Sequence, residues 1–307
     1  MAGNPRLGTR GSQLALIQAR KIASALEVVE RWPAGHVEIV TVKTSGDQIA
    51  DRPLADVGGK ALWTKELDSA LLDGDVDFCV HSMKDVEVVR PKAIRLAAIR
   101  PRVYVDDKLI GAPSVDELKP GAVVGTSSPR RAAQLLSVRP DLKIVTLRGN
   151  VDTRLKKLDA GEVDATVLSA AGLHRLRLDH VGTPIPFDIM LPAPGQGALG
   201  IECRADDEEC MQLLKLLDDA TSRSAVLAER AFARALGGSC HSPVAALATV
   251  ERGRIHLTAE ILSADGKEKL RDEITFASGH VEKAAELARQ MLDRAPEAIR
   301  TLFAAAA

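Results

Sequence analysis

The stretch that decides the fold reads AVVGTSSPRR, residues 122–131. Its apolar, β-branched start favours a strand, and the residues after Gly125 are good helix N-caps, with Pro129 suited to the first helical turn. The free backbone N–H groups at such a helix start attract anions. Arg130 and Arg131 oppose the helix dipole there unless something negative lies beside them. The stretch therefore predicts a strand, a turn and a helix that together bind an anionic ligand.

Two echoes indicate that this arrangement occurs twice in the chain. Residues 6–12, RLGTRGS, lead into an amphipathic run as residues 122–131 do. Residues 74–82, GDVDFCVHS, resemble residues 161–169, GEVDATVLS, and in both a helix ends at glycine before a short buried strand. The sequence therefore predicts two related α/β lobes, each with ligand-facing loops at the carboxyl ends of its strands.

The order of the remaining segments predicts how these lobes are assembled. An apolar run over residues 198–203 follows the second lobe, which suggests that the chain crosses back to complete the first. A helix and alternating strands then indicate a small α+β domain. We expect a first lobe from residues 1–101 and 197–218, a second lobe from residues 102–196, and a third domain from residues 219–307.

Composition argues against several classes of protein. Lys and Arg number 41 against 42 Asp and Glu, and aromatic residues make up 3% of the chain. We therefore expect no nucleic-acid partner, because a basic surface and stacking platforms are both lacking. No apolar run is long enough to span a membrane, and the N-terminus has no signal core. The four cysteines lack CxxC spacing, which predicts neither a zinc site nor a redox pair and fits the cytoplasm.

Several motifs together resemble the porphobilinogen deaminase family, also called hydroxymethylbilane synthases. They are RGS at 10–12, VGGK at 57–60, HSMKDV at 81–86, GTSSPRR at 125–131, LRGNV at 147–151 with Arg154, PGQG at 194–197, and Cys240 in a Gly/Ser-rich loop. Each motif is weak alone. Their number and order along nearly the whole chain make the resemblance highly specific.

The resemblance implies a transferase that condenses four porphobilinogen molecules head to tail, releasing ammonia, to give linear hydroxymethylbilane. In this family the product grows on a dipyrromethane cofactor that a thioether holds to one cysteine, and Cys240 matches that residue. The resemblance also implies two periplasmic-binding-protein-like lobes with mixed sheets, followed by the small α+β domain. We expect a cytoplasmic monomer with no metal.

The resemblance also implies roles for individual residues. Asp85 matches the catalytic aspartate, whose carboxylate would stabilise positive charge on the pyrrole rings. Arginine suits the acetate and propionate groups of the pyrroles, because its planar fork holds a carboxylate bidentately. The positions matched to cofactor and substrate binding are Arg10, Ser12, Lys60, Ser82, Lys84, Thr126, Ser127, Ser128, Arg130, Arg131, Arg148, Gly149, Arg154, Arg175 and Gln196. Replacing Arg130 or Arg131 by leucine is expected to leave folding intact, since it removes a charge that opposes the helix dipole.

Departures and alternatives stay open at this point. The chain reads YVDDK at 104–108 where the family often has Asp-Pro-Arg-Asp-Ala, and Glu87 replaces a common proline. Each proposed site residue has a plainer interpretation: a solvated surface position for the arginines and Lys60, a turn or N-cap position for Asp85, and a hinge position for Gln196.

The rival function is a non-enzymatic two-lobed solute-binding protein for a polycarboxylate. That protein would need an export signal and would leave Cys240 unexplained. A ligand-sensing regulator is a second rival, but no helix-turn-helix pattern precedes the lobes.

Overall fold

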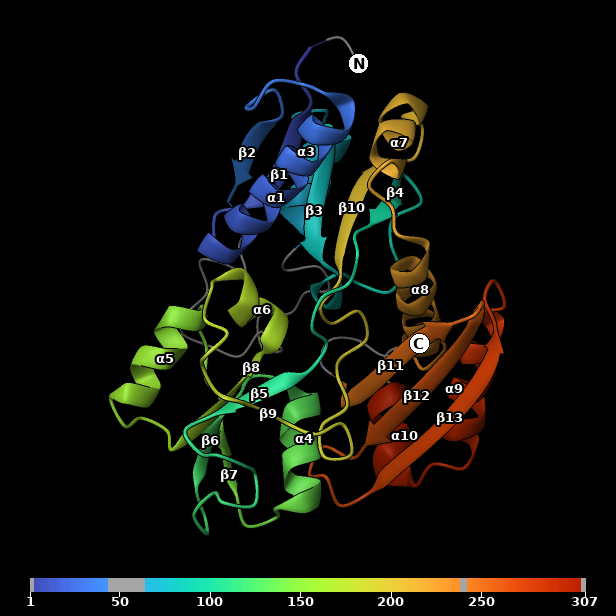
Figure 1. Ribbon diagram of the computed structural model, residues 1–307. Helices are drawn as coiled ribbons and strands as arrows, with labels where there is room; N and C mark the ends of the chain where they lie inside the picture. The colour runs from blue at the N-terminus through green and yellow to red at the C-terminus, as the bar shows by residue number, and fades with distance from the viewer. Residues whose placement is uncertain (1–2, 44–63, 238–241, 305–307) are drawn as a thin grey trace. The chain divides into compact units, whose positions relative to one another are not determined.

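The computed structural model describes residues 3–43, 64–237 and 242–304. Backbone contacts divide the chain into two compact units (Figure 1). The first consists of Met1–Val103 with Ala198–Arg223, and the second of Tyr104–Gly197 with Ser224–Ala307. The second unit therefore includes both the second sheet and the C-terminal domain.

The first unit is built around a five-stranded sheet in the order β2-β1-β3-β10-β4. Its strands are β1 (Arg6–Arg10), β2 (Glu38–Val42), β3 (Phe78–Ser82), β4 (Ile94–Ile99) and β10 (Leu199–Arg204). Strands β1, β2 and β3 are parallel, whereas β10 runs antiparallel to both of its neighbours, β3 and β4. A segment that follows the whole second sheet in sequence thus lies inside the first sheet.

Helices α1 (Gln13–Glu30), α3 (Lys65–Leu72) and α7 (Glu208–Lys215) pack around this sheet, and the 3-10 helix η2 (Met83–Asp85) follows β3 directly. Ser12 caps α1 by accepting a hydrogen bond from the Ala15 N–H at 3.3 Å, so the expected turn from strand to helix is present. The core contains Leu7, Leu26, Phe78 and Ile201, which are all fully buried.

The second unit contains another five-stranded sheet, in the order β7-β6-β8-β5-β9. Its strands are β5 (Asp107–Ile110), β6 (Val123–Gly125), β7 (Lys143–Val145), β8 (Ala165–Ser169) and β9 (Thr183–Pro184). Strand β6 is parallel to β7 and β8, whereas β5 runs antiparallel to β8 and β9. The two sheets therefore share one topology, in which a parallel trio is followed by an inserted antiparallel strand. The sequence echoes predicted this relationship, and the prediction of mixed sheets is confirmed.

Helices α4 (Pro129–Val138), α5 (Val151–Asp159) and α6 (Ala170–Arg175) follow β6, β7 and β8 in turn. Ser128 caps α4 through the Arg131 N–H, and Pro129 occupies the first turn. Asn150 caps α5 by accepting from the Thr153 N–H at 2.9 Å. Each parallel strand of this sheet thus ends at a polar turn that begins a helix.

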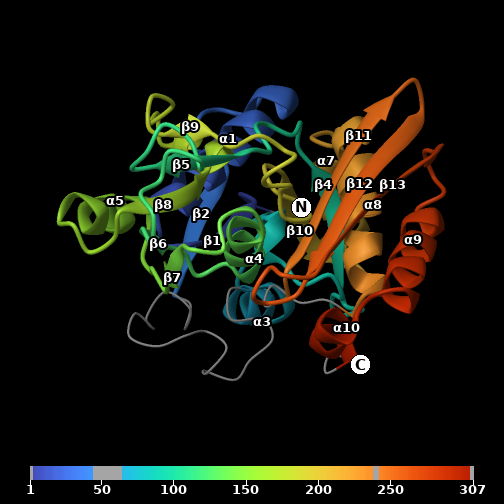
Figure 2. The same ribbon diagram turned by 90° about the horizontal axis from the view of Figure 1, so that it is seen from below.

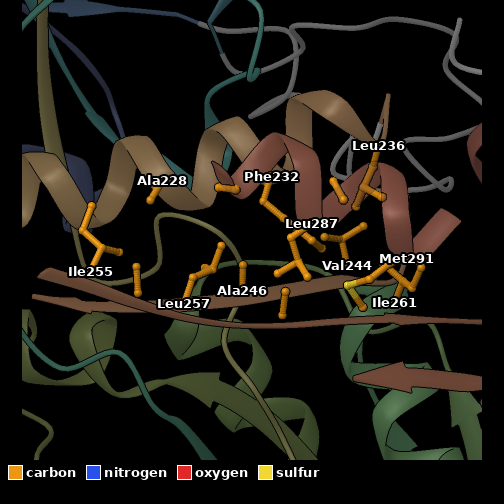
Figure 3. Close-up of a cluster of buried hydrophobic side chains, with 14 of the residues drawn as sticks. Ala228, Phe232, Leu236, Val244, Ala246, Ile255, Leu257, Ile261, Leu287 and Met291 are labelled. Carbon is orange, nitrogen blue, oxygen red and sulfur yellow. The ribbon is translucent and has the colours of Figure 1, made fainter. Parts of the chain in front are cut away.

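The C-terminal part is α+β, as the sequence predicted. It consists of α8 (Ala220–Ala235), β11 (Val244–Glu251), β12 (Arg254–Leu262), β13 (Lys269–Ala277), α9 (Glu282–Asp293) and α10 (Glu297–Ala304). The strands form an antiparallel meander. Figure 3 shows Phe232 of α8 and Leu287 of α9 meeting Leu257 and Ile261 of β12 in one apolar cluster. Figure 2, a view from below, shows helices α8, α9 and α10 beside the three strands of this domain.

Candidate functional site

In the first unit, the expected site residues follow the carboxyl ends of neighbouring strands. Strands β1 and β3 are paired, so the carboxyl end of β1, with Arg10 and then Ser12, lies at the same sheet edge as the end of β3, with Ser82 and then Lys84 and Asp85. The Gln18 Nε2 of α1 donates to the Ser82 Oγ at 3.1 Å and so fixes the end of β3. Asp85 closes η2 and its side chain is exposed. The structure thus presents a solvent-facing carboxylate beside a cationic strand end.

His81 has a different environment, although it belongs to the same motif. Its imidazole is buried, with Nε2 3.4 Å from the Glu202 carboxylate. Burial is the main cause that lowers the pKa of His81 below the usual 6.5. This placement agrees with a structural histidine and not with a solvent-facing base.

In the second unit, Arg130 and Arg131 are buried and share one carboxylate. The Arg130 Nη2 and the Arg131 Nη2 each donate to an oxygen of Asp107 at 2.6 Å. Asp107 is itself 1% exposed. Burial lowers the pKa of the Arg130 guanidinium, and the Asp107 charge opposes that effect. The negative group that the helix start required is therefore, at least in part, the protein's own Asp107.

A hydrogen-bonded chain extends from this pair into the C-terminal domain. The Arg130 Nη1 donates to the Gln134 Oε1 at 2.9 Å and to the Leu191 carbonyl at 2.7 Å. The Gln134 Nε2 in turn donates to the Glu260 Oε1 of β12 at 2.8 Å. All these side chains are buried, so the first two turns of α4 are held rigidly from several elements.

The polar turns after β6 and β7 are joined to each other. The Ser127 Oγ donates to the Leu147 carbonyl at 2.7 Å, which ties residues 126–128 to the loop that carries Arg148. Gly149 has a φ of 113°, where a side chain would be strained and would also meet Thr153. The Arg154 Nε donates to the Gly149 carbonyl at 3.0 Å. Thr126, Ser127, Ser128, Arg148, Gly149 and Arg154 thus form one connected edge of the second sheet.

Arg175 and Gln196 support the segment that leads out of this sheet. The Arg175 Nη2 donates to the Gly197 carbonyl at 2.7 Å, and burial lowers the pKa of this guanidinium to about 10. The Gln196 Nε2 donates to the Val105 carbonyl at 2.7 Å, and the side chain is fully buried. Both residues therefore make structural contacts, whether or not they also meet a ligand.

Three arginines of this unit retain an unused hydrogen-bond donor. The Nε atoms of Arg130, Arg131 and Arg148 are buried and have no hydrogen-bond partner among the residues that the structure describes. The Arg148 guanidinium makes no hydrogen bond or ion pair at all within those residues. Unsatisfied buried donors of this kind are rare in native proteins and call for an explanation such as a bound anion. They fit a cofactor that carries several carboxylates.

Two predicted residues, Lys60 and Cys240, lie outside the described residues. Sequence reasoning also missed three buried partners of the arginines, namely Asp107, Gln134 and Glu260. The sequence does offer a hint for Asp107. It is an acid two residues before the apolar pair Leu109 and Ile110, and it lies in the segment that departs from the family pattern. Nothing local marked Glu260, whose contact spans 126 residues of sequence.

Within the described ranges, no group of three or more His, Cys, Asp or Glu side chains could hold a metal ion. No described helix is long and apolar enough to cross a bilayer. The strand ends of the second unit carry arginines and those of the first unit carry an exposed carboxylate, which are groups suited to an anionic organic ligand.

Comparison with known proteins identifies the family. Residues 6–212 match a family model described as the dipyrromethane cofactor binding domain of porphobilinogen deaminase, and residues 224–295 match the C-terminal domain of porphobilinogen deaminase. The chain belongs to the porphobilinogen deaminase family. The family prediction is thereby confirmed, and it is favoured over a non-enzymatic solute-binding protein. Members are transferases of tetrapyrrole biosynthesis that act on porphobilinogen.

Curated relatives match over nearly the full length. The porphobilinogen deaminase of Sphingopyxis alaskensis is 49% identical, over 98% of this chain and 97% of the relative. That of Nitrobacter hamburgensis is 46% identical over 98% and 96%, and that of Paracoccus denitrificans is 45% identical over 95% of each chain. Similar solved structures include an ancestral cationic amino acid solute binding protein, at 17% identity and a TM-score of 0.44, over 70% of this chain and 88% of that one.

Proposed function

We propose that this hydroxymethylbilane synthase carries its dipyrromethane as a thioether on Cys240, binds pyrrole carboxylates through its arginines and uses Asp85 as the catalytic carboxylate. The observation that supports this most directly is the set of unused Nε donors on Arg130, Arg131 and Arg148. A polycarboxylate is the ligand that three guanidinium groups at one sheet edge would select.

The residues around Asp107 define the charge that a ligand would meet. Two guanidinium groups share one carboxylate, which leaves one formal positive charge in a buried setting. Arg148 adds a second cation, and the Ser128 helix start adds oriented backbone N–H groups. These groups would hold the acetate and propionate side chains of the cofactor and of each added pyrrole. When bound, the dipyrromethane supplies the pyrrole carbon to which the first substrate is joined.

Asp85 is suited to charge stabilisation during the condensation. Loss of ammonia from porphobilinogen leaves positive charge on the substrate, and bond formation moves that charge to a second pyrrole ring. A carboxylate fixed opposite the ring N–H groups stabilises both charged states without having to reorganise. The same carboxylate can accept the proton that leaves the new bond and return one to the departing amine. Its exposed place at the end of η2 leaves it open to an incoming ring.

The attachment site is tested by intact mass under denaturing conditions. The parent protein is expected to show an excess equal to two porphobilinogen units less two ammonia, and Cys240→Ala is expected to show none. Cys79→Ala is the matched control, because burial raises the pKa of the Cys79 thiol and leaves it a poor nucleophile. The full mass excess on Cys240→Ala would exclude this attachment site.

We further propose a cytoplasmic monomer. Cys79, Cys203 and Cys210 are free thiols, which fits a reducing compartment. Sedimentation of the purified chain tests the oligomeric state, and a dimeric mass would contradict the proposal.

A further inference from the structure

A second charged cluster lies in the first unit, centred on Arg90. Its guanidinium binds Glu202 of β10 bidentately, with Nε to Oε1 at 2.9 Å and Nη2 to Oε2 at 2.7 Å. It also binds Asp68 of α3 bidentately, at 2.9 and 2.6 Å. Its Nη1 lies 3.3 Å from the Glu87 carboxylate. One cation thus holds three acids from three parts of the chain.

The cluster is buried and carries more acid than base. The side chains of Arg90, Asp68 and Glu202 are only 11%, 13% and 1% exposed. Burial alone would lower the pKa of Arg90, but the hydrogen bonds that it donates to Asp68 and Glu202 outweigh that effect and raise the pKa. Burial also raises the pKa of Glu87. The guanidinium is therefore permanently charged and is the single strong cation of the cluster.

The contacts of the cluster flank the turn that carries Asp85. On one side His81, the fourth residue of β3, lies against Glu202. On the other side Arg90, which also contacts Glu87, fixes the loop to the same Glu202 carboxylate and to Asp68 of α3. Between them the Met83 N–H donates to the Ala198 carbonyl at 3.1 Å, just before β10. Residues 82–89 are thus held at their start by the pairing of β3 with β10 and at their end by the contact of Arg90 with Glu202.

The pairing of β10 is irregular at this point. Its register against β4 shifts between Ile201 and Glu202. Such irregularities often redirect a side chain next to a functional site. Here the shift occurs at Glu202, which accepts hydrogen bonds from Arg90 and lies beside His81.

From this geometry we propose that Arg90 is a positioning residue for Asp85: it fixes residues 82–89 to β10 and α3 and so sets where the carboxylate stands. The inference rests on the proposed role of Asp85. Stability alone is a poor reason for such a cluster, because buried ion pairs can often be replaced by apolar groups without loss. The need to fix the geometry of the loop explains the cluster better, because small displacements of a reacting group reduce turnover strongly.

The test compares Arg90→Gln and Arg90→Lys with Arg95→Gln. Arg95 is the matched control, because it lies on neighbouring β4 and is 61% exposed, and its one ion pair within the described residues is a 4.0 Å contact with Glu208. For Arg90→Gln we expect kcat to fall by between about tenfold and a hundredfold, with KM changed by less than about threefold. Arg90→Lys keeps the charge and should recover part of kcat. Arg95→Gln should match the parent.

Amide hydrogen exchange gives a readout that does not depend on activity. Residues 82–89 should exchange faster in Arg90→Gln, while β1 keeps its parental protection. Parental kcat in Arg90→Gln, with only a lower unfolding temperature, would show a purely structural role and overturn the inference. If Arg90→Gln does not fold, Arg90→Lys decides, because parental kcat and parental exchange in that variant would overturn the inference equally.

Asp85→Asn belongs in the same assay, because it separates the two proposals. Parental turnover in Asp85→Asn would remove the proposed role of Asp85, whatever Arg90 does. A slow Asp85→Asn together with parental turnover in both Arg90 variants would remove only the role of Arg90.

Discussion

At the scale of single residues, the net charge of the site in the second unit depends on the balance between its carboxylates and its guanidinium groups. Asp107 neutralises one of the two arginines that hold it, and Arg148 has no partner among the described residues. The remaining positive charge is buried at Arg130 and Arg131 and partly buried at Arg148, where charge interactions are strong and costly to leave unmet. An anionic ligand would relieve that cost. Cofactor binding and the stability of the second unit should therefore be linked.

Asp85→Asn keeps the shape of the side chain and removes its charge. Losing one preorganised group opposite developing charge commonly costs on the order of a hundredfold or more in rate. Cofactor content and substrate affinity should change much less, because the arginines remain. Single-turnover kinetics with porphobilinogen, on protein of verified cofactor content, measure this. Turnover within about threefold of the parent would contradict the catalytic role.

The arginines should divide into two groups when replaced by leucine. Arg130→Leu and Arg131→Leu each break a buried ion pair with Asp107, which typically costs about 3–5 kcal/mol of unfolding free energy. The sequence did not reveal Asp107, so the expectation that folding survives at these two positions stays a prediction, to which the structure adds an expected loss of stability. Arg148→Leu breaks no described contact and should cost less than about 1 kcal/mol. Urea unfolding of the cofactor-free proteins compares the three variants.

All three leucine variants should nevertheless disturb assembly of the pyrrole chain. Mass spectra after brief exposure to porphobilinogen distinguish protein without cofactor, with cofactor only, and with added pyrroles. We expect some variants to lack the cofactor and others to stall at an early oligomer. Parental loading and extension in all three would show that these arginines do not bind the pyrrole carboxylates.

At the scale of secondary-structure elements, local patterns carried most of the information. The strand, N-cap and Pro129 of residues 122–131 have local causes, and the helix begins where those residues predict. The same holds for the Ser12 cap of α1. The partners of the charged side chains could not be predicted in this way. Arg90 meets Glu202 across 112 residues, and Arg130 meets Asp107 across 23, so only the tertiary fold defines these contacts.

His81 gives β3 a pH-dependent contribution to stability. The charged groups facing it are Glu202 of β10, Asp68 of α3, Arg10 of β1 and Arg90. Burial lowers its pKa in the folded state, so the unfolded chain takes up a proton more readily. His81 therefore contributes to the stability of the fold at pH values above 6.5, its ordinary pKa. That contribution is lost as the pH falls below 6.5 towards the lowered pKa of the folded state.

The free energy of unfolding should accordingly fall more steeply for the parent than for His81→Gln between about pH 7 and pH 5. Urea titrations at several pH values measure the two slopes. His280→Gln is the control, because His280 is a surface residue with 62% of its side chain exposed. Parallel slopes for the parent and His81→Gln would show that this histidine is not held neutral in the folded protein.

At the scale of the whole molecule, each sheet includes one antiparallel strand beside its parallel trio, and in the first sheet this strand comes from a distant part of the sequence. In the first sheet this strand is β10, which lies between β3 and β4. It contributes buried Ile201 and Cys203 to the core and Glu202 to the Arg90 cluster. A fragment that ends at residue 103 would therefore lack an interior strand. Such a fragment should not unfold cooperatively, because its sheet would be divided and Arg90 would lose its most buried partner.

The gap in the sequence of the first lobe, between the end of β4 and the start of β10, can be closed by a short turn. Strand β4 ends at Ile99, which pairs with Gly200 of antiparallel β10, and the Arg100 N–H donates to the Leu199 carbonyl at 3.0 Å. Antiparallel strands whose ends lie this close can be joined as a hairpin by a loop of a few residues. Joining residues 1–100 to residues 198–223 through a glycine-containing turn should thus give a first lobe that folds alone. We expect a single cooperative urea transition, measured by circular dichroism, and loss of that cooperativity when residues 198–223 are omitted. A joined fragment without a cooperative transition would show that the first unit depends on the rest of the chain for its stability.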